Sequence, residues 1–169
     1  MAADASPENA IAARPNNLPA PTTRFIGREH QIDEIRRLLG SSRLLTLTGA
    51  GGCGKTRLVL QLAADISELY VDGVWLVDLA ALTDAELVPQ VVAQTVGVRD
   101  VPGRAVIGML TDHLRNRVSL LILDNCEHVI GTAARIADVL LRSCPGVTIL
   151  ATSHEPLRSP GETAGACRH

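Results

Sequence analysis

The stretch from Gly49 to Thr56, with the sequence GAGGCGKT, constrains this chain more than any other feature. It matches G-x-x-x-x-G-K-[ST], the pattern of a phosphate-binding P-loop. An apolar run at 44–48 precedes it and an amphipathic helical pattern begins near Lys55, so the strand–loop–helix context of the motif is present. Glycines let backbone N–H groups approach an anion, and a new helix adds its unpaired N–H groups and positive dipole end. A phosphate site is predicted here, and a glycine-rich turn that binds nothing is the alternative.

Two further features predict how a nucleotide and a metal ion would be held. Lys55 is expected to reach the β- and γ-phosphates, and the Thr56 hydroxyl is expected to ligate Mg²⁺. Asp124 ends an apolar run at 118–124, and this hhhhD pattern would place a carboxylate on the same ion, directly or through water. Cys53 lies in the loop near a lysine and a helix N-terminus, which both activate a thiol. An oxidation switch and a small residue that merely fits the loop are both open interpretations.

Apolar runs and amphipathic patterns alternate along the rest of the chain. The expected strands are 44–48, 74–79, 118–124 and 147–152, and the expected helices are 28–39, 54–70, 85–96, 104–115 and 128–142. This alternation indicates an α/β fold, with a parallel sheet, right-handed crossovers and helices on both faces. Ligands of such sheets bind at the carboxyl ends of the strands. The P-loop, Asp124 and the pair Ser153-His154 all follow strand ends, so they are expected to converge.

The residues after Asp124 bear on hydrolysis. AAA-type ATPases place a glutamate directly after this aspartate to polarise the attacking water, whereas Asn125 can orient a water but cannot accept its proton. Glu127 either leans toward the site or stabilises the N-terminus of the following helix, and the second interpretation is favoured because acidic residues are common there. His154 either senses the γ-phosphate or is a loop histidine without a role. Slow hydrolysis is expected, with Lys55, Asp124, Asn125 and Glu127 as the candidate catalytic residues.

Composition excludes several classes of protein. A net charge of −2 argues against non-specific nucleic-acid binding, which needs a basic surface. Residues 1–5 lack a basic segment followed by an apolar one, and no apolar run is long enough to span a bilayer, so a cytoplasmic protein without membrane contact is expected. The cysteines have no metal-binding spacing and are expected to be free thiols. They are Cys53, Cys126, Cys144 and Cys167.

Four segments resemble, in their order, the nucleotide-binding core of STAND-class (NB-ARC-like) ATPases. They are RFIGRE at 24–29, GAGGCGKT at 49–56, LILDNCEH at 121–128 and LATSHEPL at 150–157. The chain looks most like the core of large actinobacterial transcriptional regulators with a LuxR-type DNA-binding tail. The resemblance covers about residues 18–161.

This resemblance implies a P-loop NTPase of the ASCE type that binds ATP rather than GTP. Family members are switches that ADP holds closed, ATP exchange opens and hydrolysis resets, and many oligomerise when open. The segment at 25–29 would line the adenine and ribose. The residues expected to contact the nucleotide are Phe25, Ile26, Gly27, Arg28, Gly49, Ala50, Gly51, Gly52, Cys53, Gly54, Lys55, Thr56, Arg57, Ser153 and His154.

The chain departs from the family at two places. The family usually has Thr-Ser-Arg where 152–154 reads Thr-Ser-His, which replaces the γ-phosphate sensor by a poorer anion partner. The family also continues into a fifth strand after Gly161-Glu162, in the order 5-1-4-3-2, and the residues from 163 onward do not look like a strand. We therefore expect the order 1-4-3-2 with the fifth strand missing. The P-loop strand would then have an uncovered edge, open to self-association or a protein partner.

The predicted organisation is a disordered linker or tail at 1–23, a P-loop nucleotide-binding domain at 24–161 and a divergent, disordered tail at 162–169. The predicted function is ATP and Mg²⁺ binding, with weak or slow hydrolysis, by a domain of a STAND-type signalling ATPase or transcriptional regulator. ADP is the other expected nucleotide, and direct DNA binding by this chain is not expected because no helix-turn-helix follows. The alternatives are a non-catalytic remnant or interaction module that has lost tight nucleotide binding, and a small stand-alone ATPase.

Overall fold

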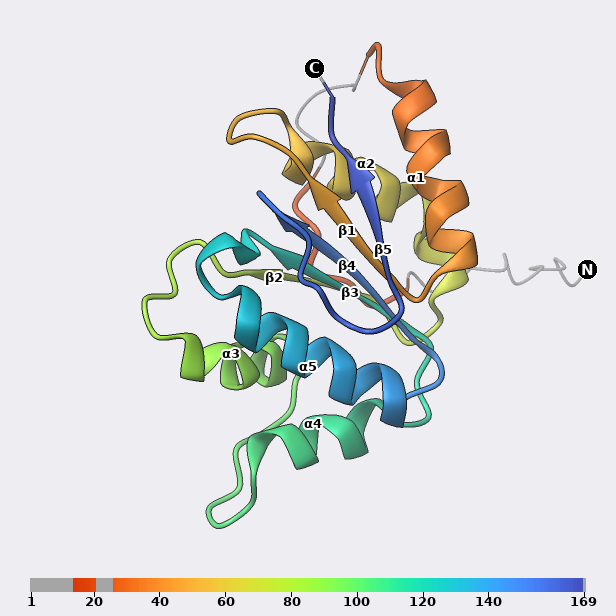
Figure 1. Cartoon of the computed structure of the whole chain (residues 1–169). Coiled ribbons are helices and arrows are strands. Elements are labelled where there is room, and N and C mark those ends of the chain that lie inside the picture. The colour runs from red at the N-terminus through yellow and green to blue at the C-terminus, as the bar shows by residue number, and fades with distance from the viewer. Residues whose placement is uncertain (1–13, 21–25, 169) are drawn as a thin grey trace, which may run out of the picture.

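Five parallel strands form one sheet in the order β2-β3-β4-β1-β5 (Figure 1). This computed structural model describes residues 14–20 and 26–168. The strands are β1 (Leu44–Thr48), β2 (Val74–Asp78), β3 (Ser119–Asp124), β4 (Val147–Ser153) and β5 (Glu162–Ala166). The α/β class and the parallel sheet predicted from the alternating pattern are confirmed. The strand that leads into the P-loop, β1, lies between β4 and β5.

Helices cover both faces of the sheet, as predicted, with α1 and α2 on one face and α3, α4 and α5 on the other (Figure 1). They are α1 (Glu29–Ser41), α2 (Lys55–Ile66), α3 (Val88–Thr95), α4 (Val106–Leu114) and α5 (Ile130–Ser143), with short 3₁₀ turns at Ser67–Leu69, Ala85–Leu87 and Cys126–His128. Side chains alternate across a strand, so Leu44 joins the apolar cluster under α3, α4 and α5, whereas Leu45 and Leu47 join the cluster under α1 and α2. Burial on both faces explains why these strands read as continuous apolar runs.

The fifth strand, predicted to be missing, is present. β5 pairs in parallel with β1 along its whole length, from Leu44 opposite Glu162 to Thr48 opposite Ala166. Residues 163–166 are Thr-Ala-Gly-Ala, in which Thr163 alone is of the branched or aromatic kind enriched in strands, so the sequence pattern did not reveal it. Backbone pairing holds the strand in place. The predictions of an uncovered β1 edge, of self-association through it and of a disordered tail over 162–166 are therefore wrong.

The chain returns from β4 to β5 through the loop at 154–161, without a helix. The Glu162 carboxylate accepts hydrogen bonds from the backbone N–H groups of Leu157 (2.8 Å) and Arg158 (2.7 Å). The Leu157 side chain is buried in the cluster under α3, α4 and α5. This buried leucine and this doubly bonded carboxylate fix the course of the loop and deliver β5 in register with β1.

Part of the predicted N-terminal linker lies along the outer edge of the sheet. The backbone N–H of Val74 donates to the carbonyl of Pro15 (3.1 Å), and the side-chain amide of Asn17 exchanges two hydrogen bonds with the backbone of Leu76 (2.6 and 2.9 Å). Residues 15–17 therefore cover the exposed edge of β2, and the expectation of a disordered linker does not hold for them. Of the other residues expected in that linker, 1–13 and 21–23 lie outside the described residues. Within the described ranges, no helix is long and apolar enough to cross a membrane.

Gly146, between α5 and β4, has no room for a side chain. A Cβ there would lie 2.4 Å from the carbonyl oxygen of Arg117, a backbone atom that cannot rotate away. We expect Gly146→Ala to lower the free energy of unfolding by about 1–3 kcal/mol, the usual effect of overpacking. The matched control is Gly108→Ala inside α4, where no atom lies within 4 Å and alanine should stabilise the helix by about 0.5–1 kcal/mol. Urea denaturation measures both, and equal stabilities for the two variants would contradict this packing.

Candidate functional site

The P-loop connects β1 to α2 and depends on three glycines. Gly52 and Gly54 have φ of +77° and +87°, in the left-handed region that favours glycine. At Gly49 a Cβ would lie 2.9 Å from the Cys53 sulfur and 3.1 Å from the Cys167 carbonyl oxygen. The helix α2 starts directly after Gly54 and has no side-chain cap. Its first N–H groups are therefore directed at the inside of the loop, where an anion would be held.

The ammonium group of Lys55 is folded back into the loop. Its Nζ donates hydrogen bonds to the carbonyl oxygens of Gly49 (2.7 Å) and Ala50 (3.0 Å), and the residue is only 8% exposed. A buried ammonium is stable because these carbonyls solvate it. An arriving phosphate would offer a charged acceptor in their place, and a bond between two charged groups is stronger than one to a neutral carbonyl.

The carboxylate of Asp124 is the most highly connected polar group of the site. The Thr56 hydroxyl lies 3.0 and 2.9 Å from its two oxygens, and the Thr152 hydroxyl donates to Oδ1. Asp124 is 3% exposed and ends β3, while Thr56 lies in the first turn of α2 and Thr152 lies in β4. The two residues expected to ligate Mg²⁺ are thus adjacent, as the convergence of strand ends predicted.

These oxygens fit a magnesium site. Mg²⁺ prefers oxygen ligands and is usually held by one or two carboxylates, several waters and the phosphates of a substrate. Thr56 and Asp124 supply a hydroxyl and a carboxylate at one point, beside the loop in which phosphates would lie. Among the described residues no cluster of three or more His, Cys, Asp or Glu side chains could hold a metal without such a substrate. The donor set therefore suits an ion that arrives with a phosphate.

Asn125 links the ends of three strands. It has a left-handed backbone conformation (φ 62°), its N–H donates to the Thr152 hydroxyl (2.9 Å), and its side-chain amide donates to Asp78 (3.1 Å) and Asp124 (3.2 Å). The amide is thus bonded within the protein. Asp78 and Thr152 were not predicted from the sequence as site residues. Their place at strand ends was the available signal, since Asp78 lies opposite Asp124 in the register of β2 and β3.

Glu127 faces the site rather than the helix that follows it. α5 begins without a side-chain cap, so the favoured interpretation of Glu127 as a capping residue is wrong. Its Oε1 lies 3.8 Å from Nε2 of His154, and its Oε2 is buried without a hydrogen-bond partner. The same His154 nitrogen is 3.8 Å from the point that a Cβ on Gly51 would occupy. Glu127, His154 and the P-loop therefore meet at one place, with a carboxylate oxygen left unpaired.

The remaining predicted residues divide into those that touch the loop and those that do not. Arg28 donates from Nη1 to the Cys53 carbonyl (2.8 Å) and so crosses the loop. Ile26 is 84% exposed, Gly27 has φ of +95°, and Phe25 lies outside the described residues. Ser153 is fully buried opposite Thr48, and its hydroxyl has no partner. The structure brings Arg28 to the phosphate loop and leaves the side chain of Ile26 in solvent.

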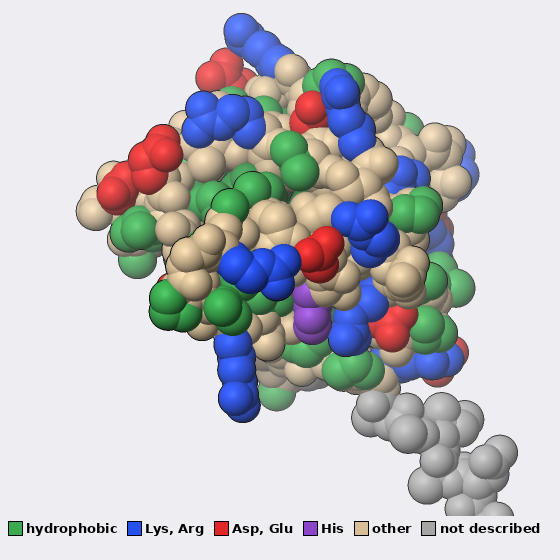
Figure 2. Space-filling view, turned by 90° about the horizontal axis from the view of Figure 1, so that it is seen from below, with side chains coloured by type: hydrophobic (Ala, Val, Ile, Leu, Met, Phe, Trp, Pro, Cys, Tyr) green, Lys and Arg blue, Asp and Glu red, His purple; other side chains and the backbone are tan. Residues whose placement is uncertain are grey.

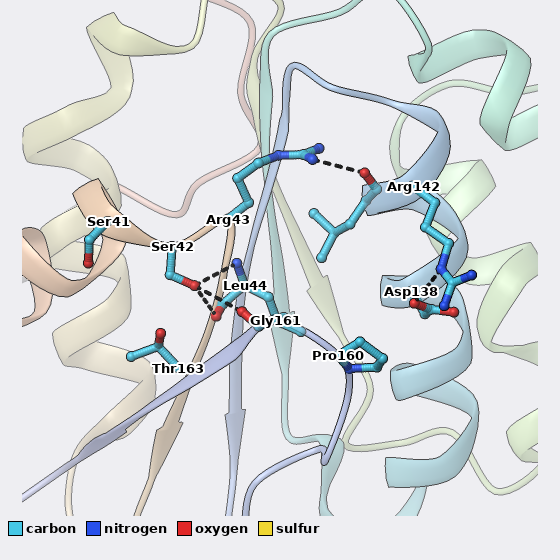
Figure 3. A pocket seen from close by; sticks show the side chains of 10 residues that line it. Ser41, Ser42, Arg43, Leu44, Asp138, Arg142, Pro160, Gly161 and Thr163 are labelled. Atoms are coloured by element: carbon cyan, nitrogen blue, oxygen red, sulfur yellow. Dashed lines mark hydrogen bonds and ion pairs between the residues drawn. The ribbon is translucent and has the colours of Figure 1, made fainter.

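A separate hollow of about 480 Å³ lies at the opposite end of the sheet, where β1 starts (Figure 3). Arg43 projects there, but its guanidinium donates to the carbonyls of Leu141 (2.9 Å), Cys144 and Val147 (3.1 Å). Arg142 pairs with Asp138 at 2.9 Å. Both cations thus have partners within the protein, and the hollow lies away from the carboxyl ends of the strands. Its polar groups hold the end of α5 in place.

The face seen from below the view of Figure 1 carries a mixture of side chains. Basic side chains are interspersed there with acidic and apolar ones rather than forming one continuous basic surface (Figure 2). Charges of both signs are also paired around α4, where Asp112 lies beside Arg104 (2.9 Å) and Arg115 (3.2 Å), which flank that helix. This face therefore has no charge of one sign that would dominate long-range attraction.

Comparison with known proteins agrees with the site geometry. A profile of the AAA ATPase domain family matches residues 24–143. The chain is 43% identical over 140 residues to an uncharacterised protein of Mycobacterium tuberculosis, covering 83% of this chain and 36% of that protein. It is 47% identical over 128 residues to a M. tuberculosis protein named as an HTH-type transcriptional regulator, covering 76% of this chain and 14% of that protein. The chain thus spans little more than a third of the first relative and about a seventh of the second.

Two solved structures share the fold. One is Cdc6p from Pyrobaculum aerophilum, with a TM-score of 0.60, 18% identity, and coverage of 86% of this chain and 47% of that chain. The other is a Signal Transduction ATPase with Numerous Domains (STAND) protein from Pyrococcus horikoshii, with a TM-score of 0.58, 16% identity, and coverage of 88% and 24%. At these identities the likeness is one of fold alone.

Proposed function

Because the chain belongs to the family of AAA ATPase domains, we propose that it binds ATP or ADP together with Mg²⁺ and hydrolyses ATP slowly. The observation that carries the proposal is the contact of Thr56 with Asp124 beside the P-loop, at 2.9–3.0 Å. A hydroxyl on the phosphate-binding helix and a carboxylate on a neighbouring strand are the pair that holds Mg²⁺ in P-loop NTPases. The uncapped N-terminus of α2 adds the phosphate-binding half of the site.

Nucleotide binding would rearrange two sets of bonds. Lys55 would exchange the carbonyls of Gly49 and Ala50 for phosphate oxygens, and Thr56 would turn from Asp124 to the metal. Bound Mg²⁺ would neutralise charge on the phosphates. Asp124 would keep its bonds from Thr152 and Asn125, which fix the carboxylate in place. The nucleotide thus replaces contacts that the free site makes with itself.

We assign the proton-accepting role in hydrolysis to Glu127. Asn125 cannot accept a proton, and its amide is bonded to Asp78 and Asp124. The buried, unpaired Oε2 of Glu127 is the free carboxylate oxygen near the P-loop. Glu127 lies three positions after Asp124, whereas efficient AAA-type enzymes have their catalytic glutamate directly after the corresponding aspartate. This displaced base supports slow turnover.

Glu127→Gln tests this assignment. The amide keeps the size of the side chain but cannot accept a proton, so the turnover rate is expected to fall by about 10²-fold or more, while the affinity for ATP stays within about twofold. Multiple-turnover phosphate release measures the rate. Glu155→Gln is the matched control, because Glu155 is exposed next to His154 and pairs with Arg158 instead. A Glu127→Gln rate equal to that of the control would exclude Glu127 as the base.

The wider role follows from the relatives. We propose that the chain is the nucleotide-binding domain of a STAND-type signalling ATPase or transcriptional regulator. The relative named as an HTH-type transcriptional regulator supports this, and the shared fold with a STAND protein agrees with it. A cytoplasmic location follows from the same role. The chain spans 14% of that regulator, so DNA contact is assigned to the rest of such a protein and not to these residues.

One titration separates this function from its alternatives. Thermal unfolding is followed with ATP, ADP or GTP, each with and without Mg²⁺. A ligand at about 100 times its Kd stabilises a protein by about 2.7 kcal/mol, so ATP and ADP with Mg²⁺ are expected to raise the Tm and GTP is not. If millimolar ATP leaves the Tm unchanged, the result would favour the alternative of a remnant that has lost tight nucleotide binding. A fast turnover by the isolated chain would favour the stand-alone ATPase.

A further inference from the structure

Two buried cysteine side chains meet beneath the P-loop. Cys53 lies in the loop, and Cys167 follows β5, where its N–H donates to the Thr48 carbonyl (2.7 Å). The Cys167 thiol donates to the Cys53 carbonyl at 3.3 Å. The point that a Cβ on Gly49 would occupy is 2.9 Å from the Cys53 sulfur and 3.2 Å from the Cys167 Cβ. The two side chains thus fill one space, which glycine at position 49 keeps open.

Cations lie beside both sulfurs. Nζ of Lys55 is 3.9 Å from the Cys53 sulfur, and Nη1 of Arg28 donates to the Cys167 sulfur at 3.6 Å. Positive charge next to a thiol stabilises its thiolate, which is the reactive form. Burial, together with a side-chain hydrogen bond with Cys53, raises the pKa of Cys167. Because Cys53 lies in the loop itself with the Lys55 ammonium 3.9 Å from its sulfur, we expect it to react first and Cys167 to react second.

The other two cysteines, Cys126 and Cys144, are buried in the cluster under α3, α4 and α5, apart from Cys53 and Cys167. The Cys126 thiol donates to the carbonyl of Leu123 (3.2 Å), and burial with the nearby Asp124 charge raises its pKa to about 12. The Cys144 thiol donates to the carbonyl of Thr111 (3.6 Å), on the other side of the sheet from the P-loop helix. Burial raises the pKa of the Cys144 thiol as well, although Arg115 and Arg43 lie near it, and buried thiols with a raised pKa react poorly. Selective oxidation would therefore involve Cys53 and Cys167.

We propose that Cys53 and Cys167 form a disulfide that regulates nucleotide binding by the P-loop. The oxidant is a small-molecule disulfide. The Cys53 thiolate attacks one of its sulfurs, forming a mixed disulfide and releasing one thiol, and the Cys167 thiolate then attacks the Cys53 sulfur and releases the second. Two cysteines lose two electrons, the oxidant becomes two thiols, and those thiols carry the two protons.

The effect on binding rests on the proposed function. A bond to Cys167 would tie the loop to the end of β5, which is itself paired with β1 along its length. It would also hold the Cys53 sulfur beside Lys55, whose ammonium has to leave the loop carbonyls to reach a phosphate. The oxidised chain is expected to bind ATP about tenfold more weakly, within the usual range of coupling between two sites. By the same linkage, bound ATP is expected to make the disulfide less favourable at equilibrium by the same factor.

The bond itself is tested without reference to nucleotide. The full chain is incubated with oxidised glutathione, digested without reduction and analysed by mass spectrometry. The expected product is a peptide pair linked through Cys53 and Cys167, which dithiothreitol separates again. Cys53→Ser and Cys167→Ser should each prevent it, and the matched control Cys144→Ser should not, with circular dichroism to check that each variant is folded. A chain that stays reduced, carries only a glutathione adduct, or links other cysteines would overturn the proposal.

The regulatory effect is tested by ATP titration of the reduced and the oxidised chain. A tenfold rise in the Kd on oxidation, reversed by dithiothreitol, supports it. Equal Kd values in the two forms would overturn the regulatory effect and leave the disulfide standing. If the reduced chain itself does not bind ATP, the proposed function fails along with the regulatory effect, and the mass-spectrometric result decides on the disulfide alone.

Discussion

Lys55→Ala is expected to abolish the thermal stabilisation that ATP and Mg²⁺ give to the wild type. The ammonium is buried in the loop, where it donates to the carbonyls of Gly49 and Ala50. Without it, a phosphate in the loop would lose the positive charge of this side chain. Its loss removes charge-assisted hydrogen bonds, each of which contributes about 1.5–3 kcal/mol, so the affinity should fall by a factor of about 10–100 or more. Isothermal titration calorimetry with Mg²⁺ and ATP measures this change.

Two comparisons make the Lys55 result specific. Arg36→Ala removes a cation from an exposed ion pair on α1 and should leave the affinity unchanged. Lys55 is also the sole lysine in the sequence, so acylation of its amine, read from a single peptide, is a second reporter. Bound ATP is expected to protect that amine from the reagent. Equal affinities for the wild type and Lys55→Ala would refute a nucleotide site at this loop.

Asp124→Asn is expected to remove the contribution of Mg²⁺ to nucleotide binding and to weaken the fold. The carboxylate accepts from Thr56, Thr152 and Asn125 while almost fully buried. An amide has one acceptor oxygen and turns an N–H₂ group toward at least one of these donors. Losing one hydrogen bond to a buried charge lowers stability by about 1.5–3 kcal/mol. Urea denaturation without nucleotide measures this loss of stability. ATP titration with and without Mg²⁺ measures the contribution of the metal to nucleotide binding.

The matched control for Asp124→Asn is Asp78→Asn. Asp78 ends the neighbouring strand in register with Asp124, but it is exposed and does not contact Thr56. Its amide variant should retain the response to Mg²⁺ and lose little stability. If both variants respond to Mg²⁺ as the wild type does, the metal is not held by Asp124, and its carboxylate has a structural role alone.

The parts that could be predicted from the sequence are those in which local pattern and tertiary structure agree. The glycine spacing from Gly49 to Gly54 and the apolar runs that end at Thr48 and Asp124 predict the loop, the parallel sheet and the meeting of Thr56 with Asp124. β5 was missed because its small residues have no pattern of their own, and what determines it is the need of β1 for a backbone partner. The role of Glu127 was misjudged because acidic residues are common at helix N-termini, whereas Glu127 lies within a short 3₁₀ turn, Cys126–His128, that ends before α5 begins at Ile130.

Contacts between side chains and distant backbone could not be predicted in the same way. The bonds of Asn17 to β2 and of Glu162 to the loop before β5 depend on where chain segments pass each other, which no periodicity records. The same holds for Asp78 and Thr152, whose importance follows from strand register. Lys55 is a related case. Its place in the P-loop motif predicts a phosphate contact, but not the carbonyl groups to which it donates in the free loop.

The position of β1 between β4 and β5 affects how the chain is made on a ribosome. β1 is complete at Thr48, but the strands on its two sides begin at Val147 and Glu162, so the nearer partner starts 99 residues later. At a synthesis rate of about 5–20 residues per second, β1 and its buried leucines wait for about 5–20 seconds without a strand partner. Any nascent chain that stops before Val147 would expose both edges of this strand. The phosphate loop is therefore made well before the two strands that give it its final support.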